Sequence, residues 1–563
     1  MIQADFIIKN ANILTLDEQG TRGASLTAYK GRITGIWPEQ VPPYHEIEQV
    51  KGTQEFDLKG ATLLPGFIDT HNHILMYAQY KRQVDCTSPR NESIADMQAS
   101  VAQFTGKTEK GDWVLGFGYD DTLLLEKRHP TKQDLDVVST EHPIFIRHIS
   151  GHLAVANTAA LRLAGVNENT PQPEGGHIGK DEAGELTGVL YEPGAMDLVF
   201  QHIPIPQADE LVQLLKEAAI DYTSQGITTN TDAGVGLLLG EREFDVHIRA
   251  VNEKANPMKM RFMVLNHLLS GNGAFSTYTA EELDREIQGR TGGKAKLDSA
   301  KLFQDGSIQG LTGALREPYS CDEQLYGELI FDQEKLNEFA LDFHNRGFRI
   351  ATHGNGDRAI GSVIEAYEYA IKNGVERDHR HRIEHVQTAS KHDLETMREL
   401  DIAASFFINH VYYWGDRHRD IFLGHERAQR INPLKEADEL DMLFTLHSDC
   451  PITPISPLFS VWAAVNRVTR NGEILGPDQK IDVETALKSM TIYGARLNFE
   501  EDEMGSVEVG KAADFAVLAE DPTNVDPMHI KDIEVLATVI DGEVVYSKSP
   551  SLTLPEVRET YSF

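Results

Sequence analysis

The middle of the chain alternates between short apolar segments and longer segments with helical periodicity, and this alternation constrains the fold most strongly. Residues 208–226, for example, place Leu211, Leu215 and Tyr222 on one helical face and stop at Gly226. Eight strand candidates occur in this part of the chain, most of them separated by helical segments: TLLPGFIDTHNH, ITTNTDA, RFMVLNH, SAKLFQDG, FRIATHG, HRIEHVQ, IAASFFIN and LFTLHSD. Eight strands in such alternation predict an α/β fold, the (β/α)₈ TIM-like barrel.

Both ends of the chain differ from this pattern, because they consist of short strand-like runs broken by turns. We expect residues 1–64 and 497–563 to form one small β-sandwich domain beside a barrel of residues 65–496. A further stretch, from about residue 85 to 205, carries extra strand-like runs and Gly-rich loops. It predicts a long insertion after the first barrel strand.

Composition excludes several classes of partner. The formal net charge is −34, which repels nucleic acids and anionic membrane surfaces. The three cysteines lie far apart without a CxxC motif, so neither a disulfide framework nor a cysteine zinc site is expected. The N-terminus lacks the pattern of a signal peptide, and no apolar run has the length of a membrane span. A cytoplasmic protein acting on a small molecule is the simplest expectation.

Polar side chains recur where the barrel strands end. His71 and His73 are two residues apart on the first strand and therefore share one direction. Active sites of such barrels lie at the carboxyl ends of the strands. Six candidate metal ligands converge there: His71, His73, Lys301, His353, His385 and Asp449. Imidazole and carboxylate suit Zn²⁺, Fe²⁺ or Mn²⁺, with zinc the default. Hydrogen-bonded core or surface histidines are the alternative.

Lys301 is the unusual member of this set, because an ammonium is repelled by a divalent metal. A buried lysine can lose its proton. Reaction with CO₂ would then give an N6-carboxylated lysine, an anion able to bridge two metals. The alternative is an ordinary salt-bridged lysine on a barrel strand.

Several motifs together resemble those of a known family: PGFIDTHNH, KLFQDGS, ATHGNGDRAI, RIEHVQ, HSDCPITPISPL and the tail VGKAADFAVLAEDP. They are similar to motifs of the amidohydrolase superfamily, and more narrowly of its amidohydrolase-3, YtcJ-like branch, which includes N-substituted formamide deformylases. The similarity spans nearly the whole chain. One departure is HSDCP, where the branch commonly has a small residue before Ser-Asp and an aromatic residue after it.

This resemblance implies a role for each candidate ligand. His71 and His73 match the pair that holds the more buried metal, and His353 and His385 match the ligands of a second one. Lys301 matches the bridging, often carboxylated lysine. Asp449 matches a metal ligand that is also the general base. One or two divalent ions are therefore expected.

The expected activity is metal-dependent hydrolysis of a carbon–nitrogen bond other than a peptide bond, in an amide or an N-substituted formamide. Hydrolysis of esters or cyclic imides, or isomerisation, would use the same site. A non-catalytic ligand-binding barrel is an alternative of another class. A homodimer is implied only by the resemblance.

Four residues are candidates for substrate contacts. His148 and His152 lie in the insertion, where they could contact substrate or order the loop by hydrogen bonds. His410 and Trp414 follow the seventh strand, with Tyr412 and Tyr413 between them. These aromatic residues could line an apolar pocket or pack within the loop.

Overall fold

The structure, a computed structural model, describes residues 1–88, 90–149, 151, 153–173 and 176–548. The chain divides into two compact units. The first consists of residues 1–74 together with the chain from residue 215 onward, and the second is the intervening stretch, residues 75–214.

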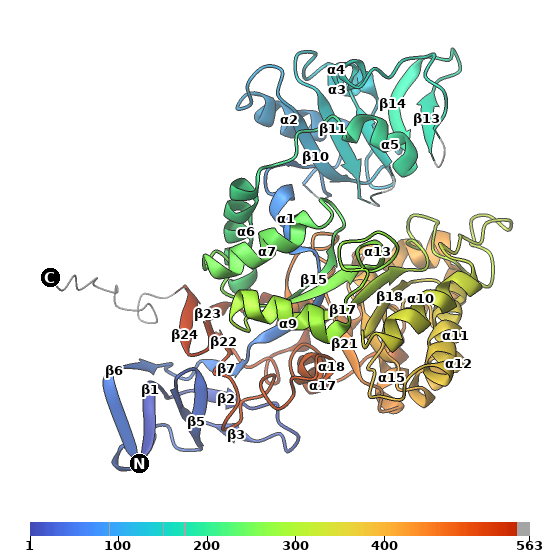
Figure 1. Cartoon of the computed structure of the whole chain (residues 1–563). Coiled ribbons are helices and arrows are strands. Elements are labelled where there is room, and N and C mark those ends of the chain that lie inside the picture. The colour runs from blue at the N-terminus through green and yellow to red at the C-terminus, as the bar shows by residue number, and fades with distance from the viewer. Residues whose placement is uncertain (89, 150, 152, 174–175, 549–563) are drawn as a thin grey trace. The chain divides into compact units, whose positions relative to one another are not determined.

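The first unit contains a barrel of parallel strands (Figure 1). Its eight-stranded sheet has the order β21-β20-β19-β18-β17-β16-β15-β8, so neighbours in the sequence are neighbours in space. The strands are β8 (Phe67–Asn72), β15 (Ile227–Val235), β16 (Lys259–Leu265), β17 (Ala295–Phe303), β18 (Ile350–Gly354), β19 (Arg382–His385), β20 (Ala403–Phe406) and β21 (Phe444–Leu446). Each of the eight predicted segments contributes one strand to this sheet, which confirms the TIM-like barrel.

The first and last strands meet through the loop after β21. The backbone N–H of His73 donates to the carbonyl of Cys450 at 2.7 Å, and that of Asp449 donates to His71 at 3.2 Å. The hydroxyls of Thr70 and Thr445 lie 2.9 Å apart across the same seam. These contacts bring the β8 histidines next to Asp449.

Helices cover the outer side of the barrel strands (Figure 1). The predicted helix at residues 208–226 is α6 (Ala208–Thr223). Helix α11 (Asp357–Asn373) buries the face formed by Ile360, Val363 and Tyr367. Its polar residues, such as Glu365 and Glu368, are not fully buried. The other helices along the barrel are α7 (Arg242–Asn252), α9 (Ala280–Thr291), α10 (Gln333–Asn345), α12 (Lys391–Glu399), α15 (Leu434–Glu439), α17 (Val483–Ser489) and α18 (Ile492–Leu497).

The stretch TLLPGFIDTHNH was expected to be one strand, and the structure divides it in two. β7 (Thr62–Pro65) pairs with a strand from the C-terminal part, and β8 belongs to the barrel. Gly66 separates them, and a Cβ there would lie 2.2 Å from the Thr228 side chain. Only glycine lets the chain pass this close to β15.

The terminal strands form two further sheets. One contains β1 (Ile2–Lys9), β4 (Ser25–Tyr29), β5 (Arg32–Trp37) and β6 (Ile47–Asp57). The other joins both ends of the chain: β2 (Asn12–Leu14), β3 (Arg22–Gly23), β7, β22 (Phe515–Leu518), β23 (Val535–Ile540) and β24 (Glu543–Ser547). Phe6, Phe56 and Phe515 belong to one hydrophobic core. A separate sandwich domain bounded at residues 64 and 497 stays a prediction.

The second unit has its own sheet, in the order β13-β14-β12-β11-β10-β9. Strands β9 to β11 are parallel and the others are antiparallel. The expected insertion lies within this unit. Its elements are β9 (Val84–Asp85), α2 (Ile94–Thr105), β10 (Val114–Tyr119), α3 (Lys132–Asp136), β11 (Ile144–His148), β12 (Leu153–Ala156), α4 (Thr158–Leu163), β13 (His177–Lys180), β14 (Leu186–Tyr191) and α5 (Glu192–Phe200).

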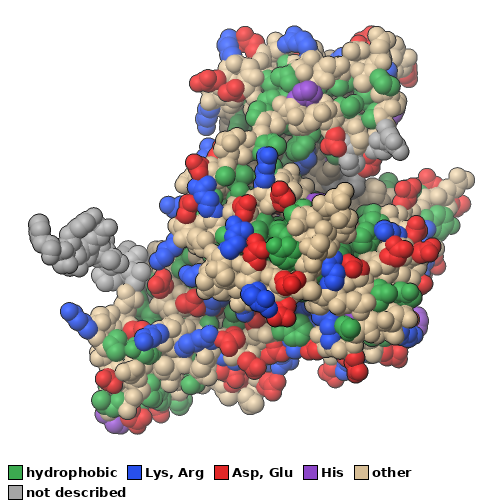
Figure 2. Space-filling view, viewed as in Figure 1, with side chains coloured by type: hydrophobic (Ala, Val, Ile, Leu, Met, Phe, Trp, Pro, Cys, Tyr) green, Lys and Arg blue, Asp and Glu red, His purple; other side chains and the backbone are tan. Residues whose placement is uncertain are grey.

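Charged side chains of both signs are interspersed over the face shown in Figure 2. Within the described part of the chain, every helix is too short or too polar to cross a lipid bilayer.

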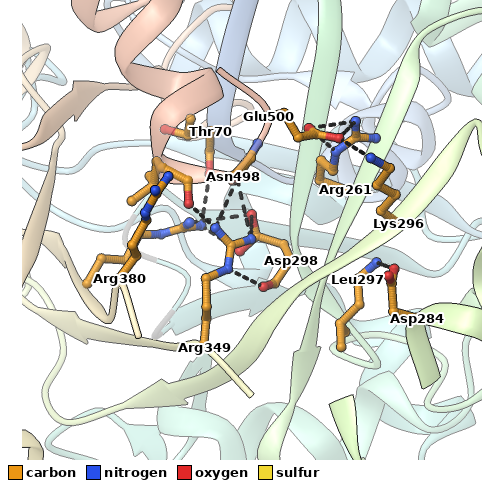
Figure 3. A network of polar contacts seen from close by, with 12 residues as sticks. Thr70, Arg261, Asp284, Lys296, Leu297, Asp298, Arg349, Arg380, Asn498 and Glu500 are labelled. Atoms are coloured by element: carbon orange, nitrogen blue, oxygen red, sulfur yellow. Dashed lines mark hydrogen bonds and ion pairs between the residues drawn. The ribbon is translucent and has the colours of Figure 1, made fainter. Parts of the chain in front are cut away.

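Ion pairs close the amino-terminal end of the barrel (Figure 3). Glu500 follows α18 and binds Arg261 from β16 and Lys296 from β17, each at 2.6 Å. Arg349, just before β18, donates to the Leu497 carbonyl. Arg380, just before β19, donates to the Arg496 carbonyl. Residues 496–501 therefore lie across the starts of four barrel strands.

Substitution of Glu500 tests this closure. Arg261 and Glu500 are almost fully buried, so Glu500→Gln leaves a buried guanidinium without its counter-charge. We expect the free energy of unfolding to fall by about 3–5 kcal/mol, measured by urea denaturation. Glu503→Gln is the matched control, because its pair with Arg32 has the same 2.6 Å distance but is about half exposed. That loss should stay below about 1 kcal/mol, and equal losses would contradict the role of Glu500.

Candidate active site

The two β8 histidines approach one carboxylate. Nε2 of His71 and Nε2 of His73 each lie 3.3 Å from Oδ1 of Asp449. His71 is fully buried, and the other two side chains are 11–12% exposed. Strand alternation accounts for the shared direction of the histidines, and the seam between β8 and β21 accounts for the position of Asp449.

Two histidines from neighbouring strands complete the same cluster. Nε2 of His385 lies 3.0 Å from Nδ1 of His353. Ligand atoms of His71, His385 and Asp449 all lie within 4.8 Å of one another. Burial lowers the pKa of His353 to about 3, reinforced by Lys301, and it lowers that of His385 well below its usual range. Both imidazoles are therefore neutral near pH 7, the form that binds metals.

Lys301 lies on β17 and is completely buried. Its Nζ has no hydrogen-bond partner among the described residues, and it lies 5.1 Å from the centre of the Phe303 ring. Burial lowers the pKa of Lys301 to about 8, and Glu384 and Asp449 limit the shift. An unpaired buried amine is costly, so this side chain calls for a partner that the protein atoms do not supply.

Sequence reasoning missed Glu384, which supports His71. Oε2 of Glu384 lies 2.6 Å from Nδ1 of His71. Arg382 donates to Oε1 of the same carboxylate at 2.5 Å and pairs with Asp298 at 2.9 Å. Asp298 in turn pairs with Arg349 at 3.1 Å, as Figure 3 shows. These four residues, Arg349, Asp298, Arg382 and Glu384, are called the buried charge chain below.

Charge then settles the tautomer of His71. Burial alone would raise the pKa of Glu384, but Arg382 and His71 hold it well below its usual range. An ionised carboxylate only accepts hydrogen bonds, so Nδ1 of His71 carries the proton. On the other side of the ring, Nε2 faces the Asp449 carboxylate at 3.3 Å, and Glu384 and Asp449 raise the pKa of His71 although burial and Lys301 lower it. Nε2 is therefore the nitrogen that a metal would take up in place of a proton. The sequence does carry a signal for Glu384. In RIEH, Arg382 and Glu384 are two residues apart on one strand and so point in the same direction.

Left-handed backbone brings two of the cluster residues into place. In a regular strand Glu384 and His385 would point in opposite directions, yet both have ligand atoms within 4.8 Å of one on His71. His385 has φ +72° and Val386 has φ +48°, which breaks the alternation. Asp449 was expected at the end of the eighth strand, but β21 ends at Leu446. Asp449 lies in the following loop with φ +50°. Such conformations are disfavoured for non-glycine residues and cluster at functional sites.

His447 is a second residue close to the cluster. Its Nε2 lies 3.3 Å from Nδ1 of His385, and its ring centre lies 4.5 Å from that of His71. It is fully buried, and burial lowers its pKa well below the usual range. The departure noted in HSDCP therefore falls on a residue that packs against two of the candidate ligands.

The predicted substrate contacts separate into different groups. His410 begins α13 (His410–Arg417) directly after β20, and its ring centre lies 6.4 Å from that of His385. Trp414 packs 5.7 Å from His410. Tyr412 and Tyr413 instead contact Phe459 on α16 (Pro457–Asn466), so they pack between two helices.

One of the two insertion histidines lies among the described residues. His148 lies in the second unit, 3.1 Å from a carboxylate oxygen of Asp121. His152 lies outside the described residues.

The sequence of this chain is similar to those of known proteins. Residues 54–546 match the sequence model of the amidohydrolase family. The chain belongs to this family. The YtcJ protein of Bacillus subtilis (strain 168), which carries the name of an amidohydrolase, is 29% identical over 553 residues, covering 95% of this chain and 98% of that protein. An N-substituted formamide deformylase of Arthrobacter pascens is 28% identical over 562 residues, covering 97% and 99%.

A solved structure agrees with the fold. It is an uncharacterized metal-dependent hydrolase from Pyrococcus horikoshii OT3, with a TM-score of 0.74 and 23% sequence identity. The match covers 93% of this chain and 99% of that one. The two chains therefore share their architecture over nearly their whole length.

Substitution of Glu384 tests the tautomer of His71. In metal-free protein the Nδ1 proton of His71 lies in a short, charge-assisted hydrogen bond, so we expect one strongly downfield imidazole N–H signal by NMR. Glu384→Gln removes the charge, and this signal should move upfield or disappear. Glu368→Gln, in an exposed pair with Lys372, should leave it unchanged. A downfield signal that survives in Glu384→Gln would contradict the assignment.

Proposed function

We propose that this member of the amidohydrolase family is a metal-dependent hydrolase of a carbon–nitrogen bond in a small amide, with N-substituted formamides as the first substrates to test. The observation that carries the proposal is the convergence of four imidazoles, a carboxylate and an unpaired lysine at the carboxyl end of one barrel. The Arthrobacter pascens relative, named for its action on N-substituted formamides, supports the choice of substrate class.

The side chains fit a divalent metal. Nε2 of His71 and Nε2 of His73 converge on Oδ1 of Asp449, and Nζ of Lys301 is a buried atom without a hydrogen-bond partner among the described residues. His71, His73 and Asp449 would hold one ion, and His353 and His385 a second one. A carboxylated Lys301 would bridge the two. Nitrogen and oxygen donors of this kind suit Zn²⁺ best, with Fe²⁺ and Mn²⁺ as alternatives.

Asp449 is the proposed general base. A divalent ion bound here would lower the pKa of a water molecule and polarise the substrate carbonyl. Histidines hold the pKa of Asp449 well below its usual range although burial opposes ionisation, so its carboxylate is charged and able to accept a proton. It would take the proton from the attacking water and deliver it to the leaving nitrogen, giving an acid and an amine.

Turnover and metal content together test this function. We expect metal-loaded protein to hydrolyse at least one compound in a panel of N-formyl amines, other amides, ureas and cyclic imides, and a chelator to abolish the activity. Asp449→Asn should lower kcat by about 10²–10⁴-fold because the proton acceptor is lost. Asp441→Asn, at an exposed position, is the control. Protein that takes up no divalent metal, or an unchanged kcat in metal-loaded Asp449→Asn, would contradict the proposal.

Carboxylation of Lys301 makes a separate prediction. Only the neutral amine reacts with CO₂, and its pKa of about 8 means that the neutral fraction rises between pH 7 and pH 9. Bicarbonate should therefore increase metal uptake, more strongly at pH 9 than at pH 7. Native mass spectrometry should show one added CO₂ in metal-loaded protein. Lys301→Met should show neither effect, and an unmodified amine in fully metal-loaded wild-type protein would contradict carboxylation.

A further inference from the structure

We propose a second, separate divalent-cation site in the unit of residues 75–214, with Asp120, Asp121 and His148 as its protein ligands. The site stands on residues of this unit alone, and it does not depend on the function proposed for the barrel.

Topology places these residues together. β10 and β11 are adjacent parallel strands, and Tyr119 at the end of one is paired with His148 at the end of the other. Asp120 and Asp121 follow β10 directly. The ligands therefore gather at the carboxyl ends of parallel strands, the edge where open α/β sheets bind their ligands.

The distances between donor atoms suit one ion. Ligand atoms of Asp120, Asp121 and His148 all lie within 4.8 Å of one another. Oδ1 of Asp121 is 3.1 Å from Nε2 of His148 and 3.7 Å from Nδ1 of His129. Two ligands of a tetrahedral zinc ion are separated by about 3.4 Å, which these two distances bracket. His129 lies beside this group, where its Nδ1 is 3.3 Å from the Tyr119 hydroxyl.

Charge also favours a cation here. Asp120 and Asp121 place two carboxylates next to the His148 imidazole, with ligand atoms of all three within 4.8 Å of one another. A divalent ion bound there would neutralise the charge of the two carboxylates.

The surroundings partly exclude water. Asp120 is 5% exposed, and the side chains of His148 and Asp121 are 11% and 24% exposed. The Tyr119 ring packs 5.0 Å from the His148 ring and 6.0 Å from that of His129. Two carboxylates and one imidazole in this setting favour Zn²⁺ or Mn²⁺ over Mg²⁺, which prefers oxygen ligands and water.

The experiment separates this site from the barrel cluster by mutation. In full-length protein, His71→Ala/His73→Ala removes the β8 pair, and zinc is titrated into the apo form with stoichiometry measured by calorimetry and elemental analysis. We expect one equivalent to remain bound in the unit of residues 75–214, in addition to any ion that His353 and His385 still hold in the barrel. Adding Asp121→Asn should weaken this binding at least about tenfold, whereas Glu141→Gln, an exposed carboxylate paired with Lys110 in the same unit, should not.

Two outcomes would overturn the site: uptake that Asp121→Asn leaves unchanged, or a folded double variant that binds no zinc beyond its nonspecific background. If the double variant does not fold, the comparison uses wild-type protein, where Asp121→Asn should lower the bound zinc by one equivalent. Equal stoichiometry there would also overturn it. Wild-type protein that binds zinc at this site but takes up no metal in the barrel would contradict the proposed hydrolase function. That result would not contradict the site proposed here.

Discussion

The buried charge chain holds the candidate active site in one arrangement. It runs from Arg349 through Asp298 and Arg382 to Glu384, alternating in sign, and it ends on Nδ1 of His71. Without Arg382, an ionised Glu384 at the barrel centre would carry most of the cost of leaving water. Without Glu384, His71 could adopt either tautomer. The orientation of a proposed metal ligand thus depends on residues that never touch a substrate.

The same chain connects the site to the opposite end of the barrel. Arg349 donates to the carbonyl of Leu497, and residues 496–501 lie across the starts of the strands. A buried ionic network of this kind is weak support for stability, because apolar residues of similar volume often serve as well. Its physical effect is geometric, since each charge has one acceptable position relative to its neighbours. We infer that one network of ion pairs and hydrogen bonds connects residues 496–501, at the amino-terminal end of the barrel, with the candidate metal ligands at the carboxyl end.

The sequence predicted the features that follow from periodicity. The eight strands were identified because strand and helix alternate, and the HxH pair was oriented correctly because side chains two apart share a face. The break at Gly66 was missed because it depends on the close approach of Thr228, a contact made across 162 residues of chain. The left-handed conformations of His385 and Asp449 were missed because neither is a glycine, so no residue type signals them. Glu384 was missed because the assumed alternation assigned the inward direction to His385.

The residues predicted to contact substrate come from a different part of the architecture. The proposed ligands and the charge chain come from strands and strand ends, so they specify the chemistry that a family shares. The segment after β20 is built differently. His410 and Trp414 lie on α13, which leads into a π-helical turn at His418–Phe422, an irregularity common near functional sites. His410 and His418 are buried, their ring centres lie 6.0 Å apart, and Phe407 packs 4.2 Å from His410. These rings stand beside His385, whose ring centre lies 6.4 Å from that of His410, and they pack on one another outside the proposed ligand set.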